Sequence, residues 1–427
     1  MVRPIQLLAF LSLLIGSAVP VAAQAQPDPT IRRITASASY RNAAAALDAG
    51  HEKWVENVVA LTEIPAPPFK EAERAKRFAQ MLRERGLSDV EIDEEGNVLG
   101  LRRGSADADL IVVSAHLDTV FPEGTDVKVR REGDRLLAPG IGDDSAGLAT
   151  ILSLVEALDA GKVRTRSSIL FVGTVGEEGL GNLRGVRHLF AKSRYKDRVK
   201  AFFSIDGTGL DEMTTKGVGS KRYRISFNGP GGHSYEAFGI VNPMAALART
   251  VVDFYRIEPP ANPKTTYSAS VVGGGTSVNA IPQKVWLEVD MRSEGAAELA
   301  ALERQFLSLV DEAVAGENAA RSTGAGAITA EPELIGDRPA GATAQDADIV
   351  RYTRSAFARE GIAVSQVPSS TDSNVPMGLG IPAVTVSGNA TGGRAHAPDE
   401  WIGTEKAKNV RLKRILLAAI VATAGMR

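Results

Sequence analysis

The fold of this chain is decided by residues 110–118, which read LIVVSAHLD. Residues 110–115 are nearly all Leu, Ile, Val or Ala, as expected of a strand buried on both faces of a sheet. His116 and Asp118 follow at once, and residues two apart on an extended segment point the same way. Side chains at such strand ends are anchored and yet open to a cleft. The stretch therefore predicts a buried strand that ends in a polar site.

Other buried strands and helices alternate on both sides of this stretch. Strands are predicted at 90–92, 98–101, 168–175, 201–205 and 381–386. Apolar residues at helical spacing predict helices at 43–62, 71–85, 144–159 and 405–424. This alternation predicts an α/β domain with a mostly parallel central sheet.

The pattern changes near residue 217. Half-exposed strands are predicted at 223–227, 267–272, 285–291 and 328–331, and helices at 243–255 and 296–314. The order β-α-β-β-α-β is typical of a ferredoxin-like α+β sandwich with one solvated sheet face. We therefore expect this small domain to interrupt the α/β domain. The expected boundaries are 40–216 for its first part, 217–333 for the insertion and 334–427 for its second part.

The N-terminus has the features of a secretory signal. Arg3 precedes an apolar run at residues 7–18, and small residues suited to cleavage end near residue 23. We expect residues 1–23 to be removed and residues 24–39, which are polar and small, to form a mobile leader. An uncleaved membrane anchor is the alternative, although the run is short for a bilayer. Export without a lipid anchor favours a bacterial periplasm over the medium.

Composition narrows the chemistry. The net charge of −2 gives no broad positive footprint for nucleic acid. The 427 residues contain no cysteine and only five histidines. Any metal site must therefore use His and carboxylate ligands. The absence of cysteine also leaves no thiol nucleophile.

Carboxylates recur in Gly-rich segments after predicted strands. Asp143 and Asp144 lie in PGIGDDSAG (139–147), where an Asp can cap the next helix or bridge two cations. Glu177 and Glu178 lie in GEEG (176–179), at the end of a buried strand. Because neighbouring side chains diverge, one Glu can bind metal while the other acts as a general base.

Two further candidates complete the set. Asp206 closes the strand 201–205, and His396 lies in RAHAPDE (394–400). Together with His116, Asp143 and the two glutamates 177 and 178, they supply two His and three carboxylate ligands plus one spare Glu, which suits a two-zinc hydrolytic centre. Asp118 is expected to accept the second ring N–H of His116 and so to set its tautomer.

Eight motifs, taken in order, resemble the co-catalytic zinc peptidases, the family of peptidase T, carboxypeptidase G, acetylornithine deacetylase and succinyl-diaminopimelate desuccinylase. The resemblance runs from about residue 51 to the C-terminus and implies a phosphorylase/hydrolase-like catalytic domain with an inserted dimerisation, or lid, domain. The motifs are AHLDTV (115–120), PGIGDDSAG (139–147), GEEG (176–179), SIDG (204–207), GPGGHS (229–234), SVNAIP (277–282), DMRS (290–293) and RAHAPDE (394–400).

The resemblance implies a role for each candidate. Asp143 would bridge two divalent ions, with a cis peptide to Asp144; Zn²⁺ is expected, and Mn²⁺ or Co²⁺ also suits such ligands. Glu177 would be the general base. The remaining metal ligands would be His116 and Asp206 for one ion, and Glu178 and His396 for the other.

The inserted domain is expected to contribute three residues. His233 would stabilise an oxyanion in the neighbouring subunit of a homodimer, which could be built into larger assemblies. Asn279 and Arg292 would bind substrate, with Arg292 as a carboxylate clamp. From the residues alone, without the resemblance, the favoured interpretation is that His233 caps a Gly-rich turn.

The function implied is hydrolysis of the amide bond of a small peptide or an N-acyl amino acid. Asp206 stands where the family's carboxypeptidases and deacylases usually carry Glu, which favours the peptidase T side. A catabolic aminohydrolase or deacylase of a non-peptide carboxylate, such as an aromatic amino acid, is the alternative. A binding protein without catalysis is a third possibility, but every expected ligand position is filled.

Overall fold

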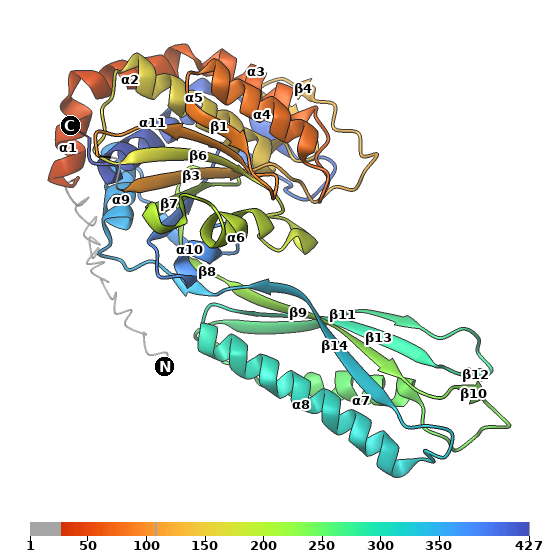
Figure 1. Cartoon of the computed structure of the whole chain (residues 1–427). Helices are drawn as coiled ribbons and strands as arrows, with labels where there is room; N and C mark the ends of the chain where they lie inside the picture. Colours follow the sequence, from red (N-terminus) through yellow and green to blue (C-terminus); the bar gives the residue numbers. More distant parts are fainter. Residues whose placement is uncertain (1–26, 107–108, 427) are drawn as a thin grey trace, which may run out of the picture.

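The computed structural model describes residues 27–106 and 109–426, and it has two parts. Figure 1 shows a large body built on one sheet and a long inserted domain that projects from it. The expected signal at residues 1–23 lies outside the described residues. Within the described ranges, no helix is both long and apolar enough to cross a bilayer.

The body contains the predicted mostly parallel sheet. Its four central strands are parallel neighbours, and antiparallel strands flank them on both sides. The order is β1 (Ser88–Ile92), β2 (Val98–Arg102), β6 (Ser168–Thr174), β3 (Leu110–His116), β7 (Val199–Ile205), β17 (Ala383–Val386), β8 (Glu212–Gly217) and β15 (Gly341–Ala342), and β16 (Ser365–Ser369) pairs with β8.

Helices cover both faces of this sheet, because its central strands are apolar on both sides. One face packs against a large core that includes α1 (Pro29–Ala36), α2 (Ala38–Ala49), α3 (His51–Thr62), α4 (Ala72–Glu84), α5 (Ala146–Ala160), α9 (Asp348–Arg359) and α11 (Lys406–Thr423). The other face packs against α6 (Arg184–Ala191) and α10 (Asn374–Gly378).

The expectation of a mobile leader at 24–39 is wrong for its described part. Residues 29–36 form α1, and α2 begins at residue 38. Ile31 and Ile34 are buried in the core of the body, which anchors α1 although its composition is polar and small. The helix expected at 43–62 is two helices that meet at Gly50.

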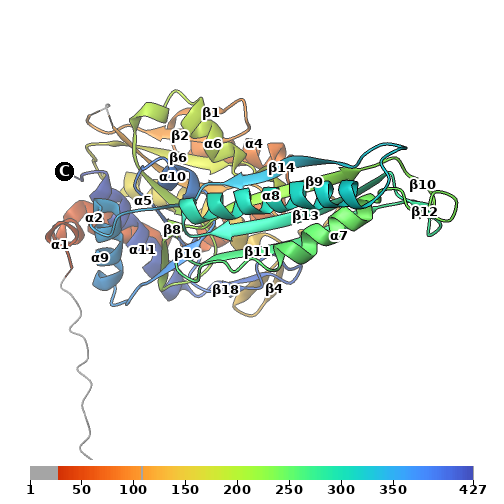
Figure 2. The ribbon, with the colours of Figure 1, turned by 90° about the horizontal axis from the view of Figure 1, so that it is seen from below.

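The inserted domain has the predicted β-α-β-β-α-β order. Its antiparallel sheet has the ferredoxin-like strand arrangement, and Figure 2 shows both helices on one face of it. The elements are β9 (Gly219–Asn228), α7 (Pro243–Phe254), β11 (Thr265–Gly274), β13 (Lys284–Ser293), α8 (Ala296–Ala320) and β14 (Thr329–Arg338), in the sheet order β11-β13-β9-β14. The short strands β10 (Gly232–His233) and β12 (Ala280–Ile281) pair at the far tip.

A small sheet at the edge of the body brings two distant loops together. It consists of β4 (Arg130–Glu132), β5 (Arg135–Leu137), β18 (Gly392–Gly393) and β19 (Trp401–Gly403). The loop 139–147 leaves β5, and the loop 394–400 connects β18 to β19. Because β5 pairs with β19, the two loops lie side by side, at the ends of the parallel strands.

Candidate metal centre

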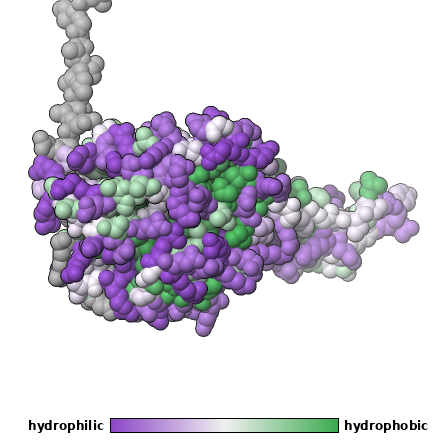
Figure 3. Space-filling view, turned by 90° about the horizontal axis from the view of Figure 1, so that it is seen from above, coloured by the Kyte–Doolittle hydropathy of each residue, from purple (hydrophilic) through white to green (hydrophobic). Residues whose placement is uncertain are grey.

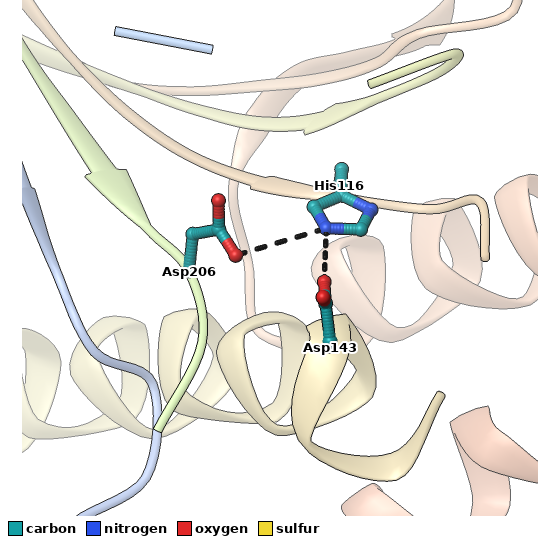
Figure 4. A group of neighbouring side chains, drawn as sticks. All are labelled: His116, Asp143 and Asp206. Atoms are coloured by element: carbon teal, nitrogen blue, oxygen red, sulfur yellow. Dashed lines mark hydrogen bonds and ion pairs between the residues drawn. The ribbon is translucent and has the colours of Figure 1, made fainter. Parts of the chain in front are cut away.

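Five side chains converge where the central strands of the body end. His116 is the last residue of β3, Glu178 follows β6, and Asp206 follows β7. Asp143 comes from the tight turn before α5, and His396 comes from the loop after β18. Figure 4 shows Asp143 and Asp206 directed at the same ring nitrogen of His116.

The carboxylate of Asp143 lies between the two histidines. Its Oδ1 is 2.7 Å from Nε2 of His116, and its Oδ2 is 3.2 Å from Nε2 of His396. Asp206 Oδ1 lies 3.8 Å from His116 Nε2, and Glu178 Oε1 lies 3.0 Å from His396 Nε2. The five residues thus form two clusters that share Asp143, and the candidate ligand atoms within each cluster lie within 4.8 Å of one another.

The electrostatics of this ligand set suit added positive charge. Burial and the neighbouring Asp143 raise the pKa of Asp206 to about 7. Hydrogen bonds to Asp143 and Glu178 raise the pKa of His396 to about 10. Both shifts favour the protonated form, because negative charge is concentrated at these ligand positions. The same negative charge would favour a bound cation. Two cations held by oxygen and imidazole ligands fit this donor set, with Asp143 between them.

The main chain around Asp143 is held by Glu400. The peptide between Asp143 and Asp144 is cis, as the resemblance implied. One oxygen of Glu400 accepts the N–H groups of Gly142 and Asp143 at 2.7 and 2.9 Å, and the other accepts that of Gly140 at 3.0 Å. Sequence reasoning missed this role, although Glu400 ends the motif that contains His396. The interaction fixes the main chain of Asp143 relative to the His396 loop.

The two paired aspartates have different surroundings. Asp143 lies between His116 and His396, which is the position that a bridging ligand would need. Asp144 is fully buried and accepts the N–H of Gly147 in the first turn of α5 at 3.2 Å, as a capping residue does. It also accepts the N–H of His116 at 3.0 Å. Asp144 therefore joins the start of α5 to the end of β3.

Asp118 differs from the expected arrangement. Its carboxylate is 3.6 Å from Nδ1 of His116, whereas its main-chain carbonyl is closer, at 3.1 Å. The carboxylate instead accepts the N–H groups of Glu177 and Glu178 at 3.1 and 2.8 Å. Asp118 therefore orients His116 chiefly through its main chain and holds the Glu177–Glu178 loop with its side chain.

The two adjacent glutamates point to different partners. Glu178 contacts His396, whereas Glu177 Oε1 accepts a hydrogen bond from Nη1 of Arg338 at 3.0 Å. Nη2 of Arg338 donates to the main-chain carbonyl of Glu177, and Nη1 also lies 3.1 Å from Ser370 Oγ. Burial raises the pKa of Glu177, and the Arg338 charge opposes that rise. Sequence reasoning missed Arg338, because it ends a strand of the inserted domain and belongs to none of the motifs.

A cavity of about 760 Å³ opens over these ligands. Asp143, Glu177, Glu178, Asp206 and His396 line it on the side of the body. Arg222, Arg292 and Arg338, from the inserted domain, also line it. Arg292 is thus in the chain's own candidate site, as expected of a substrate-binding residue.

His233 and Asn279 are not in this cavity. They line a second cavity of about 780 Å³ at the tip of the inserted domain, beside β10 and β12. Nδ1 of His233 accepts the N–H groups of Tyr235 and Glu236 at 3.3 and 3.4 Å, so His233 does cap its turn. In a neutral ring, this leaves the proton on Nε2 as a hydrogen-bond donor. Within one chain, Asn279 and Arg292 therefore line different cavities, although both were expected to bind substrate.

Comparison with known proteins places this chain among peptidases. The family model described as peptidase family M20/M25/M40 matches residues 112–420. YqjE of Bacillus subtilis (strain 168) is 24% identical over 360 residues, which cover 79% of this chain and 90% of YqjE. The structure of aminopeptidase PepT from Bacillus cereus ATCC 10987 has a TM-score of 0.69 at 22% identity, covering 88% of this chain and 98% of PepT. YXEP of Bacillus subtilis, a dinuclear metal-binding peptidase, has a TM-score of 0.65 at 18% identity, covering 88% of this chain and 99% of YXEP.

Proposed function

Because the chain belongs to peptidase family M20/M25/M40, we propose that it is a two-metal hydrolase that cleaves the C–N bond of a small peptide or an N-acyl amino acid. The observation that carries this proposal is the position of Asp143. Its two oxygens face two separate His–carboxylate clusters, as a bridging ligand requires. Glu177 also has a carboxylate oxygen within 4.8 Å of ligand atoms of His116 and Glu178, but its hydrogen bond is to Arg338, so we assign it a role beside the ions and not as a ligand.

We assign one ion to His116, Asp143 and Asp206, and the other to Asp143, Glu178 and His396. Zn²⁺ suits this mixture of imidazole and carboxylate, and Mn²⁺ or Co²⁺ fits it as well. When bound, the ions supply positive charge that lowers the pKa of water and polarises a carbonyl.

Glu177 performs the proton transfers in this proposal. It lines the cavity and is held by Arg338, so its carboxylate keeps one position while a proton arrives and leaves. It accepts a proton from the attacking water and returns it to the leaving nitrogen. Burial of Glu177 excludes bulk water from these transfers.

The size of the cavity supports a small substrate. Asp206 favours a peptidase, because the family's carboxypeptidases and deacylases usually carry Glu at this position. A volume of about 760 Å³ accommodates a short peptide or a comparably small molecule. PepT, the aminopeptidase of similar fold, favours the peptidase assignment. Arg292 suits the carboxylate of a peptide, and it suits equally the alternative of an aminohydrolase acting on a small non-peptide carboxylate.

We further propose a homodimer in which His233 serves the neighbouring subunit. The tip that carries His233 projects away from the chain's own metal centre. Large apolar side chains are exposed beside it, and Figure 3 shows a hydrophobic spot near the end of the inserted domain. These side chains are Tyr235, Phe238 and Val278, which are 86%, 82% and 103% exposed.

The N-terminal residues support a proposal for location. A charged residue, an apolar run and a small-residue segment in residues 1–23 are the parts of a cleaved secretory signal. We propose that the mature enzyme acts in a bacterial periplasm. Expression of the full-length chain in a Gram-negative host, followed by fractionation and N-terminal sequencing, tests this. Intact chain in the cytoplasm would contradict it.

A substrate screen tests the proposed activity. Enzyme loaded with Zn²⁺, Mn²⁺ or Co²⁺ is assayed with di- and tripeptides, N-acetyl amino acids and aryl amines that carry a carboxylate. We expect hydrolysis of peptides or N-acetyl amino acids, and its loss on chelation with metal release verified by elemental analysis. Cleavage of only the aryl amines would favour the aminohydrolase. Binding without turnover under every metal would indicate a binding protein.

A further inference from the structure

The wall that the inserted domain contributes to the metal-site cavity is strongly basic. Arg222 lies on β9, Arg292 on β13, and Arg338 at the end of β14. Arg338 is largely neutralised by its contact with Glu177. Arg292 was assigned above to a substrate carboxylate. Arg222 lines the same cavity and has no assigned role.

Asp290 holds these two guanidinium groups together. Its Oδ1 is 3.2 Å from Nε of Arg222, and its Oδ2 is 2.7 Å from Nε of Arg292. The register explains this contact, because Asp290 lies directly across from Arg222 and two residues before Arg292 on the same sheet face. One carboxylate between two cations leaves a net charge of +1. Both arginines contact Asp290 through Nε, so this contact leaves their terminal nitrogens unused.

Within the described residues, these terminal nitrogens have few partners. Nη1 of Arg222 donates to the carbonyl of Gly179 at 3.0 Å. No hydrogen bond is formed by Nη2 of Arg222 or by either terminal nitrogen of Arg292 in the described part of the chain. Both side chains line the cavity, and that of Arg222 is only 19% exposed. A partly buried guanidinium with an open donor is the usual form of a carboxylate-binding site.

The positive charges also crowd one another. Burial lowers the pKa of Arg222, and the neighbouring charges of Arg338 and Arg292 lower it further. Glu177 offsets much of the Arg338 charge, and Asp290 offsets only part of the repulsion between Arg222 and Arg292. An anion bound between Arg222 and Arg292 would remove the remainder.

The contact with Gly179 ties this basic wall to the catalytic loop. Gly179 follows Glu178 directly, so Arg222 joins β9 to the segment that carries the candidate base and a metal ligand. A carboxylate held by Arg222 would thus lie at a set position relative to Glu177. Positioning of this kind favours one class of substrate over another.

We propose that Arg222 is a specificity-determining residue, which forms with Arg292 a carboxylate fork held by Asp290. The enzyme then selects substrates that carry a free carboxylate over the same molecules with a neutral amide in its place. This inference rests on the proposed hydrolase function, in which Arg292 already suits a substrate carboxylate. It adds Arg222 as a second residue that recognises the carboxylate, and Asp290 as the residue that holds the two arginines together.

Matched pairs of substrates test the fork. Trialanine is compared with trialanine amide, and N-acetylmethionine with N-acetylmethioninamide, for the wild type and Arg222→Gln. The wild type should prefer the free acids. Arg222→Gln should lower kcat/KM for the acids ~10- to 100-fold, mainly through KM, and lower it less for the amides, which are affected only through the lost contact with the Gly179 carbonyl. Arg222→Lys should be intermediate, because it restores the charge but not the planar fork.

Lys221→Gln is the control. Lys221 is the neighbouring cation on β9, its side chain is 21% exposed, and it pairs with Asp337 at 3.1 Å on the other face of the sheet. The Lys221→Gln variant should keep the wild-type preference for the free acids over the matching amides. An equal loss on acids and amides in Arg222→Gln, or a wild type without preference, would overturn the inference and leave the hydrolase proposal standing.

A binding measurement separates the two proposals. Calorimetry with metal-loaded Glu177→Gln enzyme reports affinity for trialanine and for its amide without turnover. Replacing Arg222 by Gln in this background should weaken the affinity for trialanine and leave the affinity for its amide unchanged. If the wild type hydrolyses none of the four compounds, the proposed function fails for these classes, and calorimetry still tests the fork. Equal affinity for acid and amide would overturn the fork.

Discussion

Arg338 holds Glu177 at two points, its side-chain carboxylate and its main-chain carbonyl. Both side chains are about 6% exposed, so the pair is buried at the edge of the metal-site cavity. Arg338 is the last residue of β14, the strand by which the chain returns from the inserted domain to the body. The candidate base is therefore positioned by the strand end that connects the inserted domain to the body.

Replacing Arg338 should impair catalysis more than binding. In Arg338→Gln the carboxylate of Glu177 loses its fixed position, and we expect kcat to fall ~10- to 100-fold, the scale of a misplaced catalytic group. Arg338→Lys should recover part of the loss, and elemental analysis should find both metals retained. Steady-state kinetics measures the effect. An unchanged kcat with a raised KM would assign Arg338 to substrate binding alone.

Glu177 and Glu178 should fail in different ways. Glu177→Gln should keep both metals and lose at least the ~10²- to 10⁴-fold that a general base contributes. Glu178→Gln removes a ligand next to His396, so it should lose or weaken one metal site. Metal content per chain, measured beside kcat, distinguishes the two. Metal loss in Glu177→Gln with full retention in Glu178→Gln would exchange their roles.

Subunit mixing tests the role of His233. Inactive His233→Ala chains are combined with inactive Glu177→Gln chains under conditions that allow exchange. A mixed dimer has one complete site, with Glu177 from one chain and His233 from the other, so activity should return. The expected single-variant loss is ~10²- to 10³-fold, as for removal of one oxyanion donor. Verified mixed dimers without activity, or an active monomer, would refute the role in the neighbouring subunit.

Lys413 should make stability depend on pH. It is buried, its Nζ lies 4.3 Å from the centre of the Trp54 ring, and it has no hydrogen-bond partner in the described residues. Burial lowers its pKa to about 7 from 10.5. Between these values the unfolded chain binds the proton more strongly, so stability should rise with pH across this window and be lowest below it.

Lys413→Met removes the free-energy cost of burying a charged ammonium group in the folded protein. We expect it to stabilise the protein by roughly 1–4 kcal/mol at pH 6, the range seen when buried charges are replaced by apolar residues. The gain should shrink as the pH rises toward 10, where Lys413 is neutral in the folded protein and is beginning to lose its proton in the unfolded chain. Urea denaturation at both pH values measures it. Lys408→Met is the control, since Lys408 is exposed on the same helix. A gain that does not vary with pH would contradict the buried charge.

The predicted strands and helices of the body owe their success to local pattern. Strands β3 and β6 are apolar on both faces, and α5 is buried along almost its whole length, so their sequences differ plainly from those of loops. The leader at 24–39 was mistaken for the opposite reason. Its helix α1 is anchored by only two buried residues, Ile31 and Ile34, and such a short apolar pattern is easily overlooked.

The sequence by itself determined which candidate ligands are present and placed them at strand ends, because a buried strand followed by a polar Gly-rich turn is a local signal. Only the tertiary structure decided which distant residues hold the candidate base and the turn at Asp143 in place. Arg338 meets Glu177 across 161 residues, and Glu400 meets Asp143 across 257. It also separated His233 and Asn279 from Arg292, because β13 spans the inserted domain from tip to hinge. Contacts between distant segments depend on how strands pair and cross, and no short stretch of sequence records that.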